Sequence, residues 1–264
     1  MWRVLSPLLL WFLVTQLAGS ALLLLFQQKY GTGIQVYYDH ILVITGICNV
    51  ILTAAALFCY KKDSIRRAAG GLVQGKIPVK WQEGVWLLFI GAGVSHMMNL
   101  VMAVLQLFLQ DTTYQENMGR ITEGKSFFTL VLVMGIIGPL AEELIFRWLL
   151  YLRLRDHLGL WISAGISGLL FGIYHGNLFQ GIYATILGVG FAWIFECTGN
   201  LWSSVLLHIG ANVWSLVFPK IALPLADSPV AGILILGVFV LFGATVAGLL
   251  YFAKKKKTYP GRRI

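Results

Sequence analysis

Residues 126–151 read SFFTLVLVMGIIGPLAEELIFRWLLY, and this stretch decides the fold class. A helix that crosses a bilayer needs about 20 mostly apolar residues, and the stretch exceeds that length. Runs of the same kind cover residues 4–26, 41–60, 84–109, 126–151, 162–177, 181–197, 201–218 and 229–253. The sequence therefore predicts an all-α fold, a polytopic membrane helix bundle of about eight transmembrane helices that forms a single integral membrane domain over residues 1–264.

The composition excludes other protein classes. Hydrophobic residues make up 58% of the 264 residues and charged residues only 12%, whereas soluble domains average about 25% charged residues. Disordered chains have the opposite balance, and membrane β-barrels have short alternating segments in place of long apolar runs. The formal charge is +9, but the basic residues lie mostly between the apolar runs. We therefore expect membrane lipid, and no nucleic acid, as a partner.

The distribution of Lys and Arg predicts the orientation, because cytoplasmic loops carry an excess of both. If the N-terminus is cytosolic, all of the 20 Lys and Arg residues except Lys29, Arg120, Lys125 and Lys220 fall at or near the cytosolic face. We expect a multi-pass protein of the bacterial cell membrane with both termini in the cytosol. The first apolar run resembles a signal peptide at Ala18-Gly19-Ser20, but it continues to Phe26, which favours a retained helix.

The adjacent carboxylates Glu142 and Glu143 are the strongest anomaly of the sequence, because ionisable residues inside apolar spans are costly. A helix end at the interface would tolerate them, but the apolar run continues beyond Arg147 for more than a turn. Glu143 and Arg147 are spaced i, i+4 and can pair on one face, whereas Glu142 is rotated about 100° away. The spacing predicts that Glu142 lacks this partner and is available for chemistry. Pro139 can kink the helix just before the pair.

Two later spans carry imidazoles. His175 lies beside a stripe of small residues (Ala164, Gly168, Gly172 and Gly176) that allows another helix to approach closely. His208 and Asn212 are spaced i, i+4 and face the same way. Taken singly, His175 could be a hydrogen-bonded core residue, and His208 with Asn212 could join two helices. At 1.5 Å per residue, however, Glu142, His175 and His208 all lie about 12–20 Å from the cytosolic ends of their helices.

Carboxylates, imidazoles and an amide at one membrane depth suggest hydrolysis by water, in either of two ways. Glu142, His175 and His208 could form a zinc site with one open position. Without metal, Glu142 and His175 could activate water, and His208 and Asn212 could donate hydrogen bonds to the oxyanion. The sequence does not decide between these two mechanisms, so the expected cofactor is either zinc or none.

These residues resemble the CAAX protease and bacteriocin-processing family, the type II CAAX prenyl endopeptidases. Its pattern of E-E-x-x-x-R, F-x-x-x-H and H-x-x-x-N is matched, in order, by Glu142-Glu143 with Arg147, Phe171 with His175, and His208 with Asn212. The resemblance covers about residues 126–217, the expected catalytic core, and implies intramembrane proteolysis of a peptide or protein substrate. It further implies that Glu142 is the base, that Glu143 and Arg147 support it, that His175 assists, and that His208 with Asn212 stabilises the oxyanion.

Two other functions compete with the endopeptidase. A non-catalytic bacteriocin self-immunity or scaffold protein could use the same fold for binding, although an intact motif set argues against it. A proton-coupled transporter could relay protons through Glu and His, but transporters commonly show inverted repeats with matching broken helices. Neither feature is found here, and the polar groups gather in one half of the chain.

Overall fold

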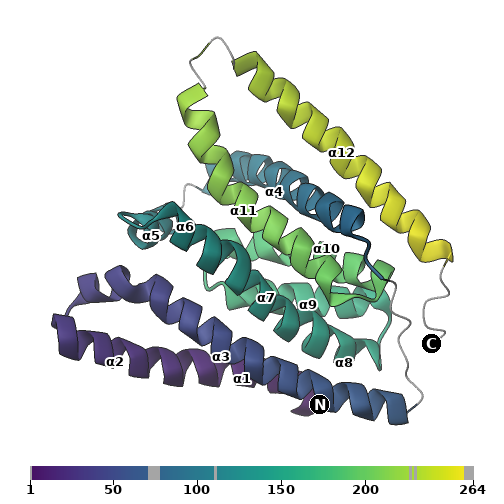
Figure 1. Ribbon diagram of the computed structural model, residues 1–264, viewed down its shortest axis with the longest axis horizontal. Helices are drawn as coiled ribbons and strands as arrows, with labels where there is room; N and C mark the ends of the chain where they lie inside the picture. The colour runs from purple at the N-terminus through teal and green to yellow at the C-terminus, as the bar shows by residue number, and fades with distance from the viewer. Residues whose placement is uncertain (1, 71–77, 110–111, 226–227, 229–230, 259–264) are drawn as a thin grey trace. The chain divides into compact units, whose positions relative to one another are not determined.

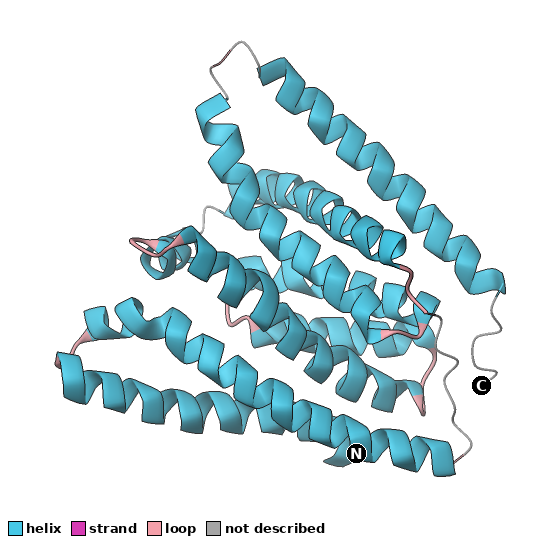
Figure 2. Ribbon diagram, in the orientation of Figure 1, coloured by secondary structure: helices cyan, strands magenta, loops and turns pink. Residues whose placement is uncertain are grey.

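The computed structural model describes residues 2–70, 78–109, 112–225, 228 and 231–258 (Figure 1). Over these residues the secondary structure is helical, and no strand occurs (Figure 2). The elements are α1 (Trp2–Leu13), η1 (Val14–Ala18), α2 (Gly19–Tyr30), α3 (Ile34–Ala69), α4 (Trp81–Leu109), α5 (Thr113–Thr122), α6 (Phe127–Leu130), η2 (Val131–Ile137), α7 (Gly138–Glu143), η3 (Leu144–Tyr151), α8 (Leu152–Arg155), α9 (Leu160–Tyr174), α10 (Leu178–Thr198), α11 (Leu201–Leu225) and α12 (Ala231–Thr258). The η segments are π-helical. The all-α prediction is confirmed.

Seven helical segments within the described residues are long and apolar enough to cross a membrane. They are Arg3–Tyr30, Ile34–Ala69, Trp81–Phe108, Phe127–Arg155, Leu178–Thr198, Leu201–Leu225 and Ala231–Lys255. The eighth expected span, 162–177, is instead α9, a helix of 15 residues. At 1.5 Å per residue α9 is about 22 Å long, shorter than the hydrocarbon core of about 30 Å. The protein is thus a polytopic helical membrane protein, whose described residues form seven full-length candidate spans and one shorter apolar helix.

The orientation of the termini stays a prediction. The prediction rests partly on Lys76 and on the basic residues within 259–264, which lie outside the described residues.

The chain divides into two compact units, the first made of residues 1–72 and 111–159 and the second of residues 73–110 and 160–264. Each unit is described by itself, and the expectation that residues 1–264 act as a single domain also stays a prediction.

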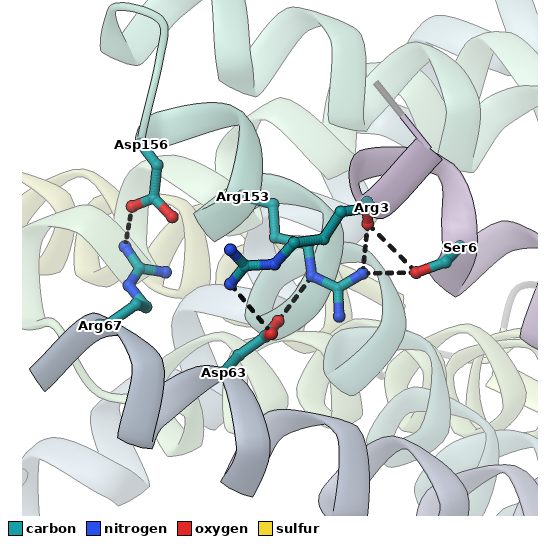
Figure 3. A network of polar contacts seen from close by, with 6 residues as sticks. All are labelled: Arg3, Ser6, Asp63, Arg67, Arg153 and Asp156. Carbon is teal, nitrogen blue, oxygen red and sulfur yellow. Dashed lines mark hydrogen bonds and ion pairs between the residues drawn. The ribbon is translucent and has the colours of Figure 1, made fainter. Parts of the chain in front are cut away.

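In the first unit, α3 packs against the N-terminal helices and against the continuous helix formed by residues 127–155 (Figure 1). A polar network around the buried Asp63 and Arg153 ties the ends of these helices together (Figure 3). The Asp63 carboxylate of α3 accepts hydrogen bonds from Arg153 Nε at 2.6 Å and from Arg3 Nη2 at 3.0 Å. Arg153 Nη1 also donates to Ser6 Oγ at 2.8 Å. The network therefore fixes α1 and α3 to the C-terminal end of the helix that carries the two glutamates.

In the second unit, α4 and α11 cross with their backbones in direct contact. A Cβ atom at Gly91 would overlap the carbonyl of Leu207, and one at Gly210 would overlap the carbonyl of Leu88. Only glycine permits so close an approach. The crossing lies immediately beside His208 and therefore sets the position of that part of α11.

The stripe of small residues on α9 serves the expected purpose at two of its positions. A Cβ atom at Gly168 would lie 2.8 Å from the carbonyl oxygen of Thr185 on α10, and one at Gly172 would lie 2.5 Å from that of Gly181. The pairing of these positions shows that α9 and α10 run antiparallel. Gly176 has a different role, because its φ of 73° places it in the left-handed turn between the two helices.

Candidate active site

The two glutamates lie on α7, a short α-helical segment between two π-helical ones. The N–H of Gly138 donates to the carbonyl of Val133, five residues earlier. Pro139, which has no N–H to donate, stands at the first turn of α7. The π-helical turns on either side allow the helix to continue through Pro139, so that residues 127–155 form one span. π-Helical turns are rare and occur frequently at functional sites.

Glu143 and Arg147 form the ion pair that their spacing predicts. Arg147 Nη1 lies 3.0 Å from Glu143 Oε1, and both side chains are fully buried. A charge removed from water in this way is tolerated only with a partner. Glu143 is therefore bound into the interior of the first unit.

Glu142 is only half-buried. Its Oε1 lies 3.9 Å from the place that a Cβ of Gly138 would occupy. Arg147 also interacts electrostatically with Glu142, in addition to the ion pair with Glu143 that the i, i+4 spacing predicts.

His175 lies in the turn after α9 and not inside a span, as the range 162–177 had suggested. Its Nδ1 is 2.8 Å from the carbonyl oxygen of Phe171. A carbonyl oxygen can only accept, so Nδ1 carries the hydrogen and Nε2 carries the lone pair of the neutral ring. The turn is continued by Asn177, whose Oδ1 accepts from Gln180 N at 2.7 Å and caps α10. The contact of Nδ1 with the Phe171 carbonyl sets the tautomer of the imidazole, and the cap at Asn177 begins the next helix.

His208 is buried in α11, and its ring stacks on Phe191 with centroids 4.5 Å apart. The edge of Phe171 meets His208 at 5.7 Å and His175 at 4.8 Å. Phe171 therefore holds both imidazoles in the second unit. Asn212, one turn beyond His208, is half-buried.

The second unit also contains a polar network. Ser95 bonds with Tyr183 Oη at 2.8 Å and with Ser215 Oγ at 2.9 Å. Its neighbour His96 accepts a hydrogen bond from Trp214 Nε1 at 3.2 Å. These bonds join α4 to α10 and α11. Tyr183 and Ser215 could not be found as partners because more than 80 residues separate each of them from Ser95.

The expected site residues divide between the two units. Glu142, Glu143 and Arg147 lie in the first unit, and His175, His208 and Asn212 lie in the second. Within either unit, the described residues include no group of three or more His, Cys, Asp or Glu side chains that could hold a metal ion. A zinc site of Glu142, His175 and His208 has suitable donor chemistry, but its ligands would have to come from both units.

Comparison with known proteins identifies the segment that carries these residues. Residues 124–214 match the family model described as Rce1-like, type II CAAX prenyl endopeptidase Rce1-like. The "Putative membrane peptidase YdiL" of Bacillus subtilis (strain 168) is 28% identical over 88 residues, which are 33% of this chain and 36% of the relative. The chain thus matches about a third of the length of that curated relative.

No solved structure matches the chain. All six expected site residues fall inside the segment matched by the family model. The resemblance that the three motifs predict is therefore confirmed: over residues 124–214 the chain is similar to the Rce1-like type II CAAX prenyl endopeptidase family.

Proposed function

We propose that this protein is an intramembrane endopeptidase that hydrolyses a peptide bond with a water molecule activated by Glu142. The observation that carries the proposal is the difference between the two adjacent carboxylates. Glu143 is fully buried against Arg147, whereas Glu142 is half-buried. One carboxylate is thus a structural partner, and the other is accessible to water.

The reaction begins when the Glu142 carboxylate accepts a proton from water, whose oxygen attacks the carbonyl carbon of the peptide bond. The negative charge moves to the carbonyl oxygen, where His208 and Asn212 donate hydrogen bonds to it. Glu142 then transfers its proton to the departing nitrogen and the C–N bond breaks. The products are a carboxylic acid and an amine, and the acid passes its proton to the amine to give a carboxylate and an ammonium group. Glu142 ends the cycle as a carboxylate.

His175 assists through its Nε2. Because Nδ1 is held by the Phe171 carbonyl, the Nε2 lone pair can accept a hydrogen bond from the attacking water. Arg147 compensates the charge of Glu143, so that the acidic pair does not carry two uncompensated charges. A zinc ion held by Glu142, His175 and His208 would supply Lewis-acid activation to the same water.

The substrate in this proposal is a peptide or protein that reaches the membrane. Cells that produce the wild-type protein should contain membrane-derived peptide products that are lost in cells producing Glu142→Gln. The matched control is Glu116→Gln, which makes the same change at an exposed glutamate of α5 and should leave the products intact. Identical products from wild type and Glu142→Gln would overturn the proposal and favour a non-catalytic immunity or scaffold protein.

A further inference from the structure

Asn49 is a buried amide on α3, outside the segment that matches the peptidase family. Its exposed fraction is 5%, and its nearest neighbours in sequence are Cys48 and Val50. In the part of the chain that the structure describes, its side chain makes no hydrogen bond. An amide that bonds with none of the described residues keeps its hydrogen-bonding capacity for another molecule, such as water.

The amide lies beside Gly138, on which the Glu142 carboxylate also borders. A Cβ atom at Gly138 would lie 3.8 Å from Asn49 Nδ2, 3.9 Å from Glu142 Oε1 and 3.3 Å from the carbonyl oxygen of Val133. Two side chains from two different helices thus approach one point, where α3 packs against α7. Because residue 138 is glycine, no side chain fills the space between the amide and the carboxylate.

A role in helix association does not account for Asn49. Polar residues that join membrane helices do so through interhelical hydrogen bonds. Ser95 and Asn99 of α4 are of this type, since both bond with Ser215 of α11. Asn49 differs from them in making no such bond within the described residues.

We infer that Asn49 is a positioning residue that holds the attacking water in line with Glu142, an inference that rests on the proposed function. The amide offers both donors and an acceptor. A water molecule over Gly138 could therefore direct one hydrogen to the Glu142 carboxylate while its remaining groups bond with Asn49. Fixing the orientation of the water in this way accelerates the chemical step and leaves substrate binding unchanged.

The first test is Asn49→Leu, which replaces the amide by an apolar side chain of similar size. We expect kcat for a cleaved peptide to fall by about 10- to 100-fold, with KM unchanged and the melting temperature not lowered. Asn49→Ser keeps a hydroxyl donor and acceptor and should retain more activity than Asn49→Leu. The control is Cys48→Ala, a buried neighbour on α3 that faces Gly19; it should keep the wild-type kcat.

Glu142→Gln, measured in parallel, separates the two ideas. If Glu142→Gln is inactive but Asn49→Leu keeps the wild-type kcat, the inference fails and the proposed function stands. An Asn49→Leu protein whose activity falls only in step with its melting temperature also contradicts the inference. If Glu142→Gln remains fully active, the proposed function fails, and the inference fails with it.

Melting temperatures supply a readout that needs no substrate. Asn49→Leu is introduced both into the wild type and into Glu142→Gln, and the shift in melting temperature is measured in each. The two shifts should differ by about 2 °C or more, because groups that share a bound water are coupled. Equal shifts in the two backgrounds would overturn the inference, whatever the activity of the preparation.

Discussion

Arg147 Nη1 lies 3.0 Å from Glu143 Oε1, and neither side chain exposes any surface. The pair therefore stands in the interior of a membrane helix bundle, beside the half-buried Glu142. In the proposed function, Glu143 is the carboxylate that stabilises the fold and Glu142 is the carboxylate that takes part in the chemistry, and the consequences can be measured.

Replacing one member of the buried pair should destabilise the protein. Arg147→Gln leaves Glu143 as an uncompensated buried charge, which costs about 3–5 kcal/mol for a truly buried pair. Glu143→Gln should cost a similar amount, and the double variant should lose less than the sum of the two. Thermal unfolding in detergent measures all three. Strict additivity would show that the two side chains do not interact energetically.

The crossing of α4 and α11 should control catalysis through His208. Gly210→Ala places a methyl group against the carbonyl of Leu88, which forces α11 outward and moves His208 and Asn212. We expect peptide cleavage to fall by about 10²-fold, as for a displacement of about 1 Å. The control is Gly237→Ala on α12, where a Cβ would meet no atom within 4 Å. Wild-type cleavage by Gly210→Ala would contradict this account of how α11 is placed.

Asp63 should be essential for the stability of the first unit. Asp63→Asn removes the carboxylate that both Arg3 and Arg153 contact, and the expected loss is about 3–5 kcal/mol because the site is buried. Asp39→Asn breaks the exposed pair with Lys125 at 3.9 Å and should cost at most about 1 kcal/mol. Denaturation in detergent compares the two variants. Equal losses would show that burial of the network in Figure 3 does not matter.

Reporter fusions test the orientation. Fusions near Gly70 and after Arg263 should report the cytosol. Fusions near Met118 and Ala226 should report the external side of the membrane. Ala226 and Arg263 are not among the residues that the structure describes. Because α9 and α10 form an antiparallel hairpin, we expect the short α9 to complete an eighth crossing. A cytosolic signal at Met118, or an external signal after Arg263, would contradict this topology.

The sequence was most informative where a relationship is local. The i, i+4 spacing of Glu143 and Arg147 and the stripe containing Gly168 and Gly172 both have the structural consequence that helical periodicity predicts. The end of α9 was missed, because His175 and Gly176 continue the apolar run although Gly176 adopts a positive φ. The apolar pattern thus locates a span better than it locates a turn.

Relationships between distant residues could not be predicted in the same way. Asn49 and Gly138 are separated by nearly 90 residues, and only the packing of α3 on α7 brings them together. The contacts of Phe171 with both histidines likewise depend on how α9 and α11 pack. A spacing rule such as F-x-x-x-H marks Phe171 but does not reveal that it also touches His208.

The most direct test of the central claim is the rate at which purified Glu142→Gln protein cleaves a peptide that the wild-type protein cleaves. Loss of the general base should lower kcat by about 10²- to 10⁴-fold while the melting temperature stays close to that of the wild type. A Glu142→Gln protein that cleaves the peptide at the wild-type rate, or a Glu143→Gln protein that loses cleavage without losing stability, would contradict the assignment of Glu142 as the base.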